Sequence, residues 1–288
     1  MAIFVDEKNK VLVQGATGHQ GVFHISEMLG FGTKVVAGVT PGKAGQDVKG
    51  VPIFNTVHDG VEETGADTSL ILVPARFAKD AVFEALDAGI KTVVTITENI
   101  PFHDTMEFVH YAKYNDALLI GPNCPGIASP GKTKIGILPG SIFLEGNVGV
   151  ASRSGTLTYE IVNSLKEKDI GQSTCVGLGG DPIIGTTFID SLIAFEEDKN
   201  TRAVVLVGEI GGTAEEDAAE YIKENISKPV FAFIAGRTAP PGKRMGHAGA
   251  IIARGKGTAK SKIESFKKAD VKLAKFPTDI ADLVEEFV

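Results

Sequence analysis

The feature that most constrains the fold is an alternation that runs along nearly the whole chain. Short runs rich in valine and isoleucine alternate with longer amphipathic stretches. Strands buried inside a parallel sheet form such short apolar runs, and the helices that cover the sheet have the longer amphipathic pattern. The alternation therefore predicts strand–helix–strand units and an α/β fold. With 288 residues, 43% of them hydrophobic, the chain can form one large or two medium domains.

The first half of the chain predicts one doubly wound domain over residues 1–125. Strands are expected at residues 10–14, 34–39, 69–73, 92–96 and 117–120, and helices at 18–29, 75–88 and 103–114. The alternation lapses at residues 121–146, where proline and glycine exclude a long helix and permit only short strands. We therefore place a domain junction at residues 126–146.

The alternation then resumes and predicts a second α/β domain over residues 147–288. Strands are expected near residues 147–152, 171–176, 203–207 and 230–233, with helices beginning near Thr156, Thr187 and Ala214. A last strand near Val271 and a helix from Ile280 complete the domain.

Charge and cysteine content exclude several classes of function. The net charge of −7 and the isoelectric point near 5.5 disfavour binding to nucleic acid or to anionic lipid. Cys124 and Cys175 lie far apart without a CxxC pattern, so no disulfide framework or cysteine-rich zinc site is expected. The N-terminal segment has no basic region followed by a long apolar run, and no window approaches eighteen uninterrupted apolar residues. We expect a cytoplasmic protein, or an organelle protein after processing.

A glycine-rich loop follows the first predicted strand. Gly15, Gly18 and Gly21 lie between that strand and the first helix, where the amides of a helix N-terminus can bind phosphate. Their GxxGxxG spacing is also compatible with a tight turn that lets the helix pack closely. The second strand ends without the acidic residue of an NAD site and is followed by Lys43, which favours the extra phosphate of CoA or NADP. The loops at 72–77 and 95–101 are expected to form the pocket walls.

The second half supplies another anion site and a candidate nucleophile. Ser154, Gly155 and Thr156 lie at a predicted helix start, where they can bind an anion or simply cap the helix. Glu209 follows an apolar strand, and His247 lies in a loop of small residues. An imidazole can accept a phosphoryl group if a carboxylate holds its other nitrogen and helix N-termini neutralise the phosphate. A lone loop histidine is otherwise more often structural.

Extended motifs across nearly the whole chain resemble the alpha subunits of succinyl-CoA synthetase, the ADP- or GDP-forming succinate–CoA ligase. They are QGATGHQGVFH at residues 14–24, GVTPGK at 38–43, TITENIP at 95–101, GPNCPG at 121–126, SRSGTLTYE at 152–160, GQSTCVGLGGDP at 171–182, GEIGG at 208–212 and GKRMGHAGAI at 242–251. So many motifs in one order are highly specific.

The resemblance implies an N-terminal Rossmann-like CoA-binding domain and a C-terminal flavodoxin-like domain. It also implies a beta subunit with an ATP-grasp fold that holds the magnesium nucleotide, ADP/ATP or GDP/GTP. The implied reaction converts succinyl-CoA, phosphate and a nucleoside diphosphate reversibly into succinate, CoA and the triphosphate. Succinyl phosphate and a phosphohistidine are its intermediates. No metal site is expected on this chain.

Carried onto matching positions, the resemblance implies a role for each of several residues. The CoA contacts would be Thr17, Gly18, His19, Gln20, Lys43, Ile96, Thr97 and Glu98. Tyr159 would lie near succinate, Ser154 to Thr156 would receive phosphate, Glu209 would orient the histidine, and His247 would be phosphorylated. Position 19 departs from the serine of some relatives, so its contact is expected through the backbone. The glycines around His247 would let its loop swing.

Several alternatives remain at this point. Related ligases act on malate or acetate, and ATP-citrate lyase contains a similar module within a longer chain. An NADP-dependent oxidoreductase would use the first glycine loop but would leave Glu209 and His247 without a role. A non-catalytic CoA-binding subunit predicts no phosphate on His247. The sequence decides neither ADP against GDP nor one alpha–beta pair against two.

Overall fold

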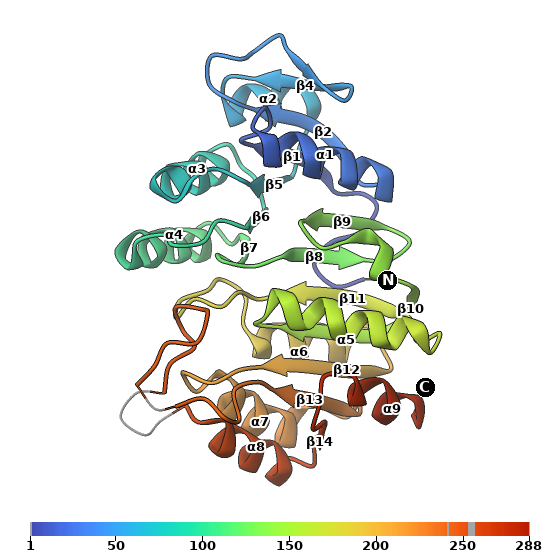
Figure 1. Ribbon diagram of the computed structural model, residues 1–288. Helices are drawn as coiled ribbons and strands as arrows, with labels where there is room; N and C mark the ends of the chain where they lie inside the picture. The colour runs from blue at the N-terminus through green and yellow to red at the C-terminus, as the bar shows by residue number, and fades with distance from the viewer. Residues whose placement is uncertain (1, 241, 253–256, 288) are drawn as a thin grey trace. The chain divides into compact units, whose positions relative to one another are not determined.

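The computed structural model describes residues 2–240, 242–252 and 257–287. Residues 1 and 288, the outer limits of the two predicted domains, lie outside this described part. The chain divides into two compact units. We call Val5–Gly140 with Ile183–Gly185 the N-terminal unit, and Met1–Phe4, Ser141–Pro182 and Thr186–Val288 the C-terminal unit. Both are built from strands and helices in alternation, which confirms the α/β fold class (Figure 1).

The N-terminal unit contains a mainly parallel sheet. Its strands are β1 (Lys10–Gln14), β2 (Lys34–Val39), β3 (Asp47–Val48), β4 (Val51–Phe54), β5 (Thr68–Ile71), β6 (Thr92–Thr95) and β7 (Leu118–Ile120). Their order is β3-β4-β2-β1-β5-β6-β7, and only the β3–β4 pair is antiparallel. Counted along the chain, the six parallel strands follow the order 3-2-1-4-5-6 of a Rossmann fold.

Four helices and a hairpin complete the N-terminal unit. They are α1 (His19–Phe31), α2 (Val57–Thr64), α3 (Ala75–Asp87), α4 (Phe102–Tyr114) and the antiparallel pair β8 (Gly126–Ser129) and β9 (Thr133–Gly136), followed by a short 3₁₀ turn at Gly140–Ile142. Helix α3 begins at Ala75, as predicted, so of the segment 72–77 only residues 72–74 lie in the loop. The elements β3, β4 and α2 were not predicted.

The C-terminal unit contains a second parallel sheet. Its elements are β10 (Glu145–Ser152), α5 (Gly155–Glu167), β11 (Gln172–Gly177), α6 (Phe188–Glu197), β12 (Ala203–Gly208), α7 (Ala214–Asn225), β13 (Val230–Ile234), α8 (Ala259–Lys268), β14 (Lys272–Leu273) and α9 (Asp279–Glu285). The five strands lie in the order β14-β13-β12-β10-β11. Counted along the chain this is 5-4-3-1-2, the flavodoxin-like order. Helix α8 was not predicted.

The strand order fixes where ligands can bind in each unit. In open parallel sheets ligands bind beyond the carboxyl ends of the strands, where the order reverses. In the N-terminal unit this point lies between β1 and β5, and in the C-terminal unit between β10 and β12. Strands β11, β12 and β13 are buried along their whole length, so the core of the C-terminal unit lies around them.

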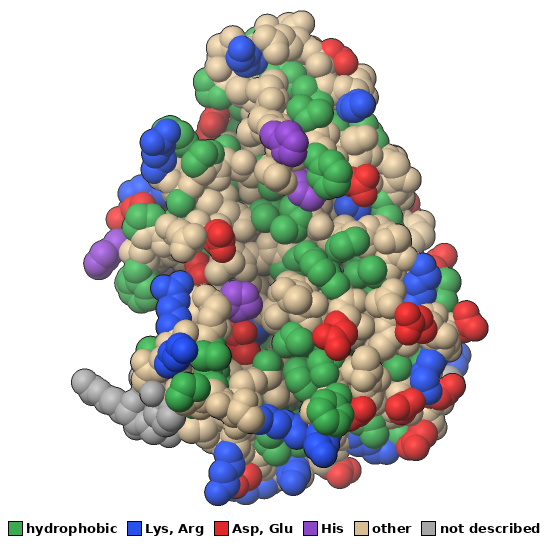
Figure 2. Space-filling view, in the orientation of Figure 1, with side chains coloured by type: hydrophobic (Ala, Val, Ile, Leu, Met, Phe, Trp, Pro, Cys, Tyr) green, Lys and Arg blue, Asp and Glu red, His purple; other side chains and the backbone are tan. Residues whose placement is uncertain are grey.

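Helix length and surface charge bear on the ligands that the sequence excludes. Within the described residues, no helix is long and apolar enough to cross a membrane. On the face drawn in Figure 2, acidic and basic side chains are interspersed and form no field of one sign. A ligand with phosphate groups must therefore be held by a local site.

Candidate active site

The glycine loop of the N-terminal unit leaves a helix start open. Gly15 has φ +82°, and its amide donates to the Val39 carbonyl at 2.9 Å, which ties the loop to β2. Gly18 is the N-cap of α1 and offers no side-chain cap, so the first amides of the helix remain available. A Cβ on Gly21 would lie 2.2 Å from the Gly15 carbonyl oxygen. The loop thus combines close packing with an uncapped helix N-terminus that suits an anion.

The predicted CoA contacts near β1 and β2 surround this helix start. The amide of Thr17 donates to the Thr40 hydroxyl at 3.3 Å, and the two threonine hydroxyls are 3.2 Å apart. Lys43 is exposed on the turn after β2. The Asn55 side-chain oxygen accepts from the amides on both sides of Lys43, at 2.9 and 3.2 Å. Asn55 therefore shapes this turn, although sequence reasoning did not select it.

The remaining predicted CoA contacts follow strand β6. Ile96 and Thr97 are half-buried, and Glu98 is exposed. The Thr97 hydroxyl donates to the Val73 carbonyl at 2.7 Å, which joins the loops after β5 and β6. All eight predicted contacts thus follow the carboxyl ends of β1, β2 and β6, at one edge of the sheet, with His19 and Gln20 exposed in the first turn of α1. Their contact with CoA stays a prediction.

In the C-terminal unit, Ser154 caps helix α5. Its hydroxyl accepts from the Leu157 amide at 3.4 Å, so the capping role considered for this serine is present. Gly155 and Thr156 form the first turn, and Tyr159 lies half-buried one turn further. The helix start follows β10, one of the two strands at the reversal of strand order. An anion site here would use the amides that Ser154 does not cap.

The second strand at that reversal, β12, leads directly to Glu209, whose carboxylate holds His247. Nδ1 of His247 lies 2.9 Å from Oε2 and 3.0 Å from Oε1 of Glu209. The Glu209 side chain is 8% exposed, whereas the imidazole is 28% exposed. No described residue forms a hydrogen bond with Nε2. If Nδ1 carries a proton and donates this hydrogen bond to the carboxylate, Nε2 has a free lone pair that can act as a nucleophile.

The charges around His247 act in opposite directions. The hydrogen bond to Glu209 raises the pKa of His247 above its ordinary value, against the effect of partial burial, which lowers it. The negative charge of Asp181 also raises this pKa, and the positive charge of Arg153 lowers it. The carboxylate therefore stabilises a positively charged ring, which is the state that a phosphorylated imidazole approaches.

Three glycines allow the His247 loop to pack closely against the turns that follow β11 and β12. The Gly249 amide donates to the Gly180 carbonyl at 3.0 Å. A Cβ on Gly180 would lie 2.3 Å from Cγ of His247, and one on Gly211 would lie 1.9 Å from the Gly249 carbonyl oxygen. Only residues without a side chain allow this approach.

A buried ion cluster lies next to Glu209 and was missed by the sequence reasoning. Arg153 pairs with Glu215 at 2.9 Å, and Glu215 also bonds the ammonium group of Lys262. Arg153 stands in the SRSGT motif and Glu215 follows the GEIGG motif, but charged residues at helix starts ordinarily face solvent. Their burial was not visible in the sequence.

Comparisons with known proteins match both units. A model of the CoA binding domain family matches residues 6–99, and a model of the CoA-ligase family matches residues 151–271. The chain is 59% identical over 288 residues, all of both chains, to a protein of Archaeoglobus fulgidus named succinate–CoA ligase [ADP-forming] subunit alpha 2. It is 57% identical over 286 residues to a Staphylococcus aureus protein named succinate–CoA ligase [ADP-forming] subunit alpha, covering 99% of this chain and 95% of that one.

Solved structures share the fold in larger chains. ATP citrate lyase from Methanosaeta concilii, in complex with (3S)-citryl-CoA, matches with a TM-score of 0.91 at 25% identity. The match covers 99% of this chain and 50% of the lyase, so the chain spans about half the length of that enzyme. An acetyl-coenzyme A synthetase of Ca. Korarchaeum cryptofilum has a TM-score of 0.74 at 22% identity, over 95% of this chain and 59% of that one, which shows the fold alone. From the full-length identities, the chain belongs to the family of succinate–CoA ligase alpha subunits.

Proposed function

We propose that this chain, with a beta subunit, catalyses the reversible conversion of succinyl-CoA, phosphate and a nucleoside diphosphate into succinate, CoA and the triphosphate. The observation that carries the proposal is the His247–Glu209 pair, with Nδ1 held at 2.9 Å and Nε2 without a described partner. This arrangement suits an imidazole that receives and releases a phosphoryl group. The names of the relatives, which are alpha subunits of ADP-forming succinate–CoA ligases, support the substrate and the nucleotide product.

The proposed reaction has three steps. A phosphate oxygen attacks the thioester carbon of succinyl-CoA, the C–S bond breaks, and the thiolate takes a proton to leave as CoA. Nε2 of His247 then attacks phosphorus in succinyl phosphate, and the P–O bond breaks with its electrons on the succinate carboxylate. Finally an oxygen of the nucleoside diphosphate attacks phosphorus, and the N–P electrons return to Nε2.

The residues of this chain would lower the barriers by position and charge. Glu209 would accept a hydrogen bond from Nδ1–H throughout and stabilise the positive ring of the phosphohistidine. The amides of Gly155 and Thr156, at the start of α5, would receive the phosphate oxygens, while the Ser154 hydroxyl keeps its capping bond. Tyr159, one turn further along α5, is proposed to lie near succinate.

The N-terminal unit is proposed to bind CoA at the glycine loop. The residues fit such a ligand, because Gly18 leaves the start of α1 uncapped and the exposed Lys43 offers a cation to a further phosphate. Thr17, His19 and Gln20 would contact the ligand beside Gly18, and Ile96, Thr97 and Glu98 would contact it from the loop after β6. An NADP oxidoreductase would share the loop but gives no role to the His247–Glu209 pair.

The nucleotide is proposed to bind outside this chain. A beta subunit with an ATP-grasp fold would hold ADP/ATP or GDP/GTP with Mg²⁺, and the name "subunit alpha" of the relatives supports a partner. His247 would then have to reach both the site where succinyl phosphate forms and the nucleotide on the partner, so its loop must move. Gly242 and Gly246, at φ +75° and +80°, would serve as hinges. Hydrogen exchange of residues 242–252 that stays unchanged on addition of the partner and nucleotide would speak against this movement.

We propose a cytoplasmic location, or the mitochondrial matrix if the chain is processed in an organelle.

A coupled assay tests the function directly. The chain co-purified with its natural partner is supplied with Mg-ATP or Mg-GTP, CoA and one of succinate, malate, acetate or citrate. We expect acyl-CoA formation with succinate and none after His247→Asn. Formation with another acid alone would assign a different ligase of this fold, and formation by the His247→Asn variant would exclude the phosphohistidine route.

A further inference from the structure

The ion cluster beside Glu209 takes no part in the reaction as proposed so far. Its members Arg153, Glu215 and Lys262 come from the end of β10, from α7 and from α8, and their side chains are 6%, 0% and 0% exposed. Burial of charges is costly, and a buried ion pair rarely contributes more stability than apolar residues of the same size. The arrangement of the cluster around Glu209 offers another role.

Glu215 contacts Glu209 through the backbone. Its Oε1 accepts from the Glu209 amide at 3.0 Å and from the Arg153 guanidinium at 2.9 Å. Its other oxygen bonds the ammonium group of Lys262, which also pairs with Glu216 at 3.3 Å and donates to the carbonyls of Gly211 and Gly212 at 3.0 and 3.2 Å. The cluster therefore bonds the backbone of Glu209, Gly211 and Gly212, which form the turn after β12.

Glu215 also determines where the guanidinium of Arg153 lies. While one nitrogen of that group pairs with Glu215, the other lies 3.8 Å from Oε1 of Glu209. This separation is too long for a hydrogen bond but short enough for a strong charge interaction at a buried site. Without Glu215, Arg153 could move onto Glu209 and compete with His247 for its carboxylate.

We propose that Glu215 is a positioning residue for phosphoryl transfer, which holds the Glu209 backbone and restrains Arg153 so that the Glu209 carboxylate stays directed at His247. This inference rests on the proposed function, because it gives the cluster a role in charging the same histidine. It differs from a purely structural role in one respect. A positioning role for Glu215 makes the proton affinity of His247 depend on Glu215 and Arg153, two buried groups that do not touch the imidazole ring.

The charges that face His247 can be named from each neighbouring element. Glu209 follows β12, Arg153 follows β10, and Asp181 lies after β11. On its own loop, Arg244 donates to the His247 carbonyl at 3.3 Å. Of these groups, Arg153 is the one that Glu215 restrains, so changes at Glu215 and at Arg153 should move the titration of His247 in opposite directions.

The test uses the full chain and two variants. Glu215→Gln/Lys262→Met removes one charge of each sign and keeps an oxygen that can accept from the Glu209 amide. Arg153→Met removes the restrained cation and leaves the Glu215–Lys262 pair intact. The titration of the His247 imidazole is followed by NMR, and phosphohistidine formation is followed with the partner and Mg-ATP.

We expect the two variants to shift the pKa of His247 in opposite directions. In the double variant Arg153 approaches Glu209, so the pKa of His247 falls, by roughly one pH unit, the usual spread among histidines in folded proteins. In Arg153→Met the same pKa rises. Phosphohistidine formation by the double variant falls by roughly 10- to 100-fold, the range seen when partners that orient metal-binding histidines are removed.

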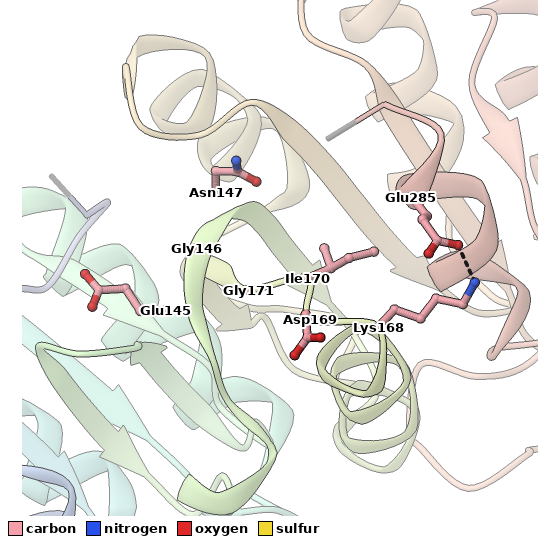
Figure 3. Close-up of a pocket in the computed structure, with 8 residues that line it drawn as sticks. All are labelled: Glu145, Gly146, Asn147, Lys168, Asp169, Ile170, Gly171 and Glu285. Atoms are coloured by element: carbon pink, nitrogen blue, oxygen red, sulfur yellow. Dashed lines mark hydrogen bonds and ion pairs between the residues drawn. The ribbon is translucent and has the colours of Figure 1, made fainter.

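A control for the two exchanges is an exposed ion pair at the amino ends of strands of the same sheet. Lys168 pairs with Glu285 beside the pocket at the amino ends of β10 and β11 (Figure 3). Glu285→Gln/Lys168→Met makes the same two exchanges away from His247, and it should leave both the titration and the labelling rate unchanged. If this control moves either readout as the test variant does, the effect is general and the proposal is overturned.

The remaining outcomes are also decisive. An unchanged titration in folded variants, or shifts of the same sign in both, overturns the proposal, as does a shifted titration with an unchanged labelling rate. If the double variant does not fold, the single variant Glu215→Gln replaces it, and a fall in the pKa of His247 supports the proposal while no change overturns it. If wild-type His247 never carries phosphate, the proposed function fails, and the titration still shows whether Glu215 positions the Glu209–His247 pair.

Discussion

Nδ1 of His247 lies within 3.0 Å of both carboxylate oxygens of Glu209, so a single buried side chain fixes one nitrogen of the imidazole. A carboxylate in this position selects the tautomer with its proton on Nδ1 and stabilises the ring when it becomes positive. Glu209 and His247 come from the end of β12 and from a loop 38 residues later. The fold, rather than local sequence, brings them together.

The first prediction concerns Glu209→Gln. The amide keeps the size of the side chain but removes the negative charge that stabilises a phosphorylated ring. Phosphohistidine formation should fall by roughly 10- to 100-fold, the loss seen when a group that orients a metal-binding histidine is removed. Labelling with the partner and Mg-ATP measures the rate. Glu220→Gln, an exposed position on α7, is the control, and an equal fall in both variants would remove Glu209 from the mechanism.

The second prediction concerns stability as a function of pH. Because Glu209 raises the pKa of His247 in the folded chain, the pair contributes stability that is complete below the ordinary histidine value of about 6.5. This contribution is lost as the pH rises through the raised value. His247→Gln should therefore lower the unfolding temperature more at pH 6 than at pH 9. Thermal unfolding at both values checks this, and a difference that grows with pH contradicts it.

The third prediction tests the close packing of the His247 ring against Gly180. A Cβ on Gly180 would lie 2.3 Å from Cγ and 2.5 Å from Nδ1 of His247, so Gly180→Ala should push the ring away from Glu209. A displacement of about 1 Å can cost about 100-fold in rate, and we expect a loss of this order in phosphohistidine formation. Gly30→Ala on the exposed face of α1, where a Cβ meets no atom within 4 Å, should leave the rate unchanged. A normal rate of phosphohistidine formation in Gly180→Ala would mean that the reaction does not need this close packing.

The fourth prediction addresses the CoA site. Lys43→Met should weaken CoA binding roughly tenfold, because hydrogen bonds to charged groups contribute about 1.5–3 kcal/mol. The loss should be smaller for a CoA analogue that lacks the 3′-phosphate if that group is the partner of Lys43. Lys34→Met is the control, since Lys34 is exposed at the opposite end of strand β2. Calorimetric titration measures both, and equal affinities would exclude Lys43 as a contact.

The regular parts of the fold could be predicted from sequence because burial and periodicity coincide there. Strands β1 and β2 have the predicted bounds, and the predicted α/β class is confirmed. The segment with β3, β4 and α2 was missed, because β3 has two residues and Pro52 interrupts the pattern of β4. Helix α8 was missed because its sequence AKSKIESFKK is mostly polar and shows little apolar periodicity.

The site was predictable only where a residue type itself indicates chemistry. A glycine loop after a strand and a histidine among small residues could be selected, and the family resemblance gave their roles. Lys262 could not be selected, because a lysine on a polar helix ordinarily faces solvent, yet its side chain is fully buried. Asn55 was missed for a similar reason, since its contact with the Lys43 turn depends on pairing between β2 and β4.

The most direct test of the account is mass spectrometry of the His247 peptide, prepared at neutral to alkaline pH because acid hydrolyses phosphohistidine. The chain, co-purified with its natural partner, is incubated with Mg-ATP or Mg-GTP and digested. We predict phosphate on His247, on none of the other five histidines, and its loss on addition of succinate and CoA. An unmodified His247 peptide with both nucleotides would contradict the account and leave a CoA-binding subunit without phosphoryl transfer.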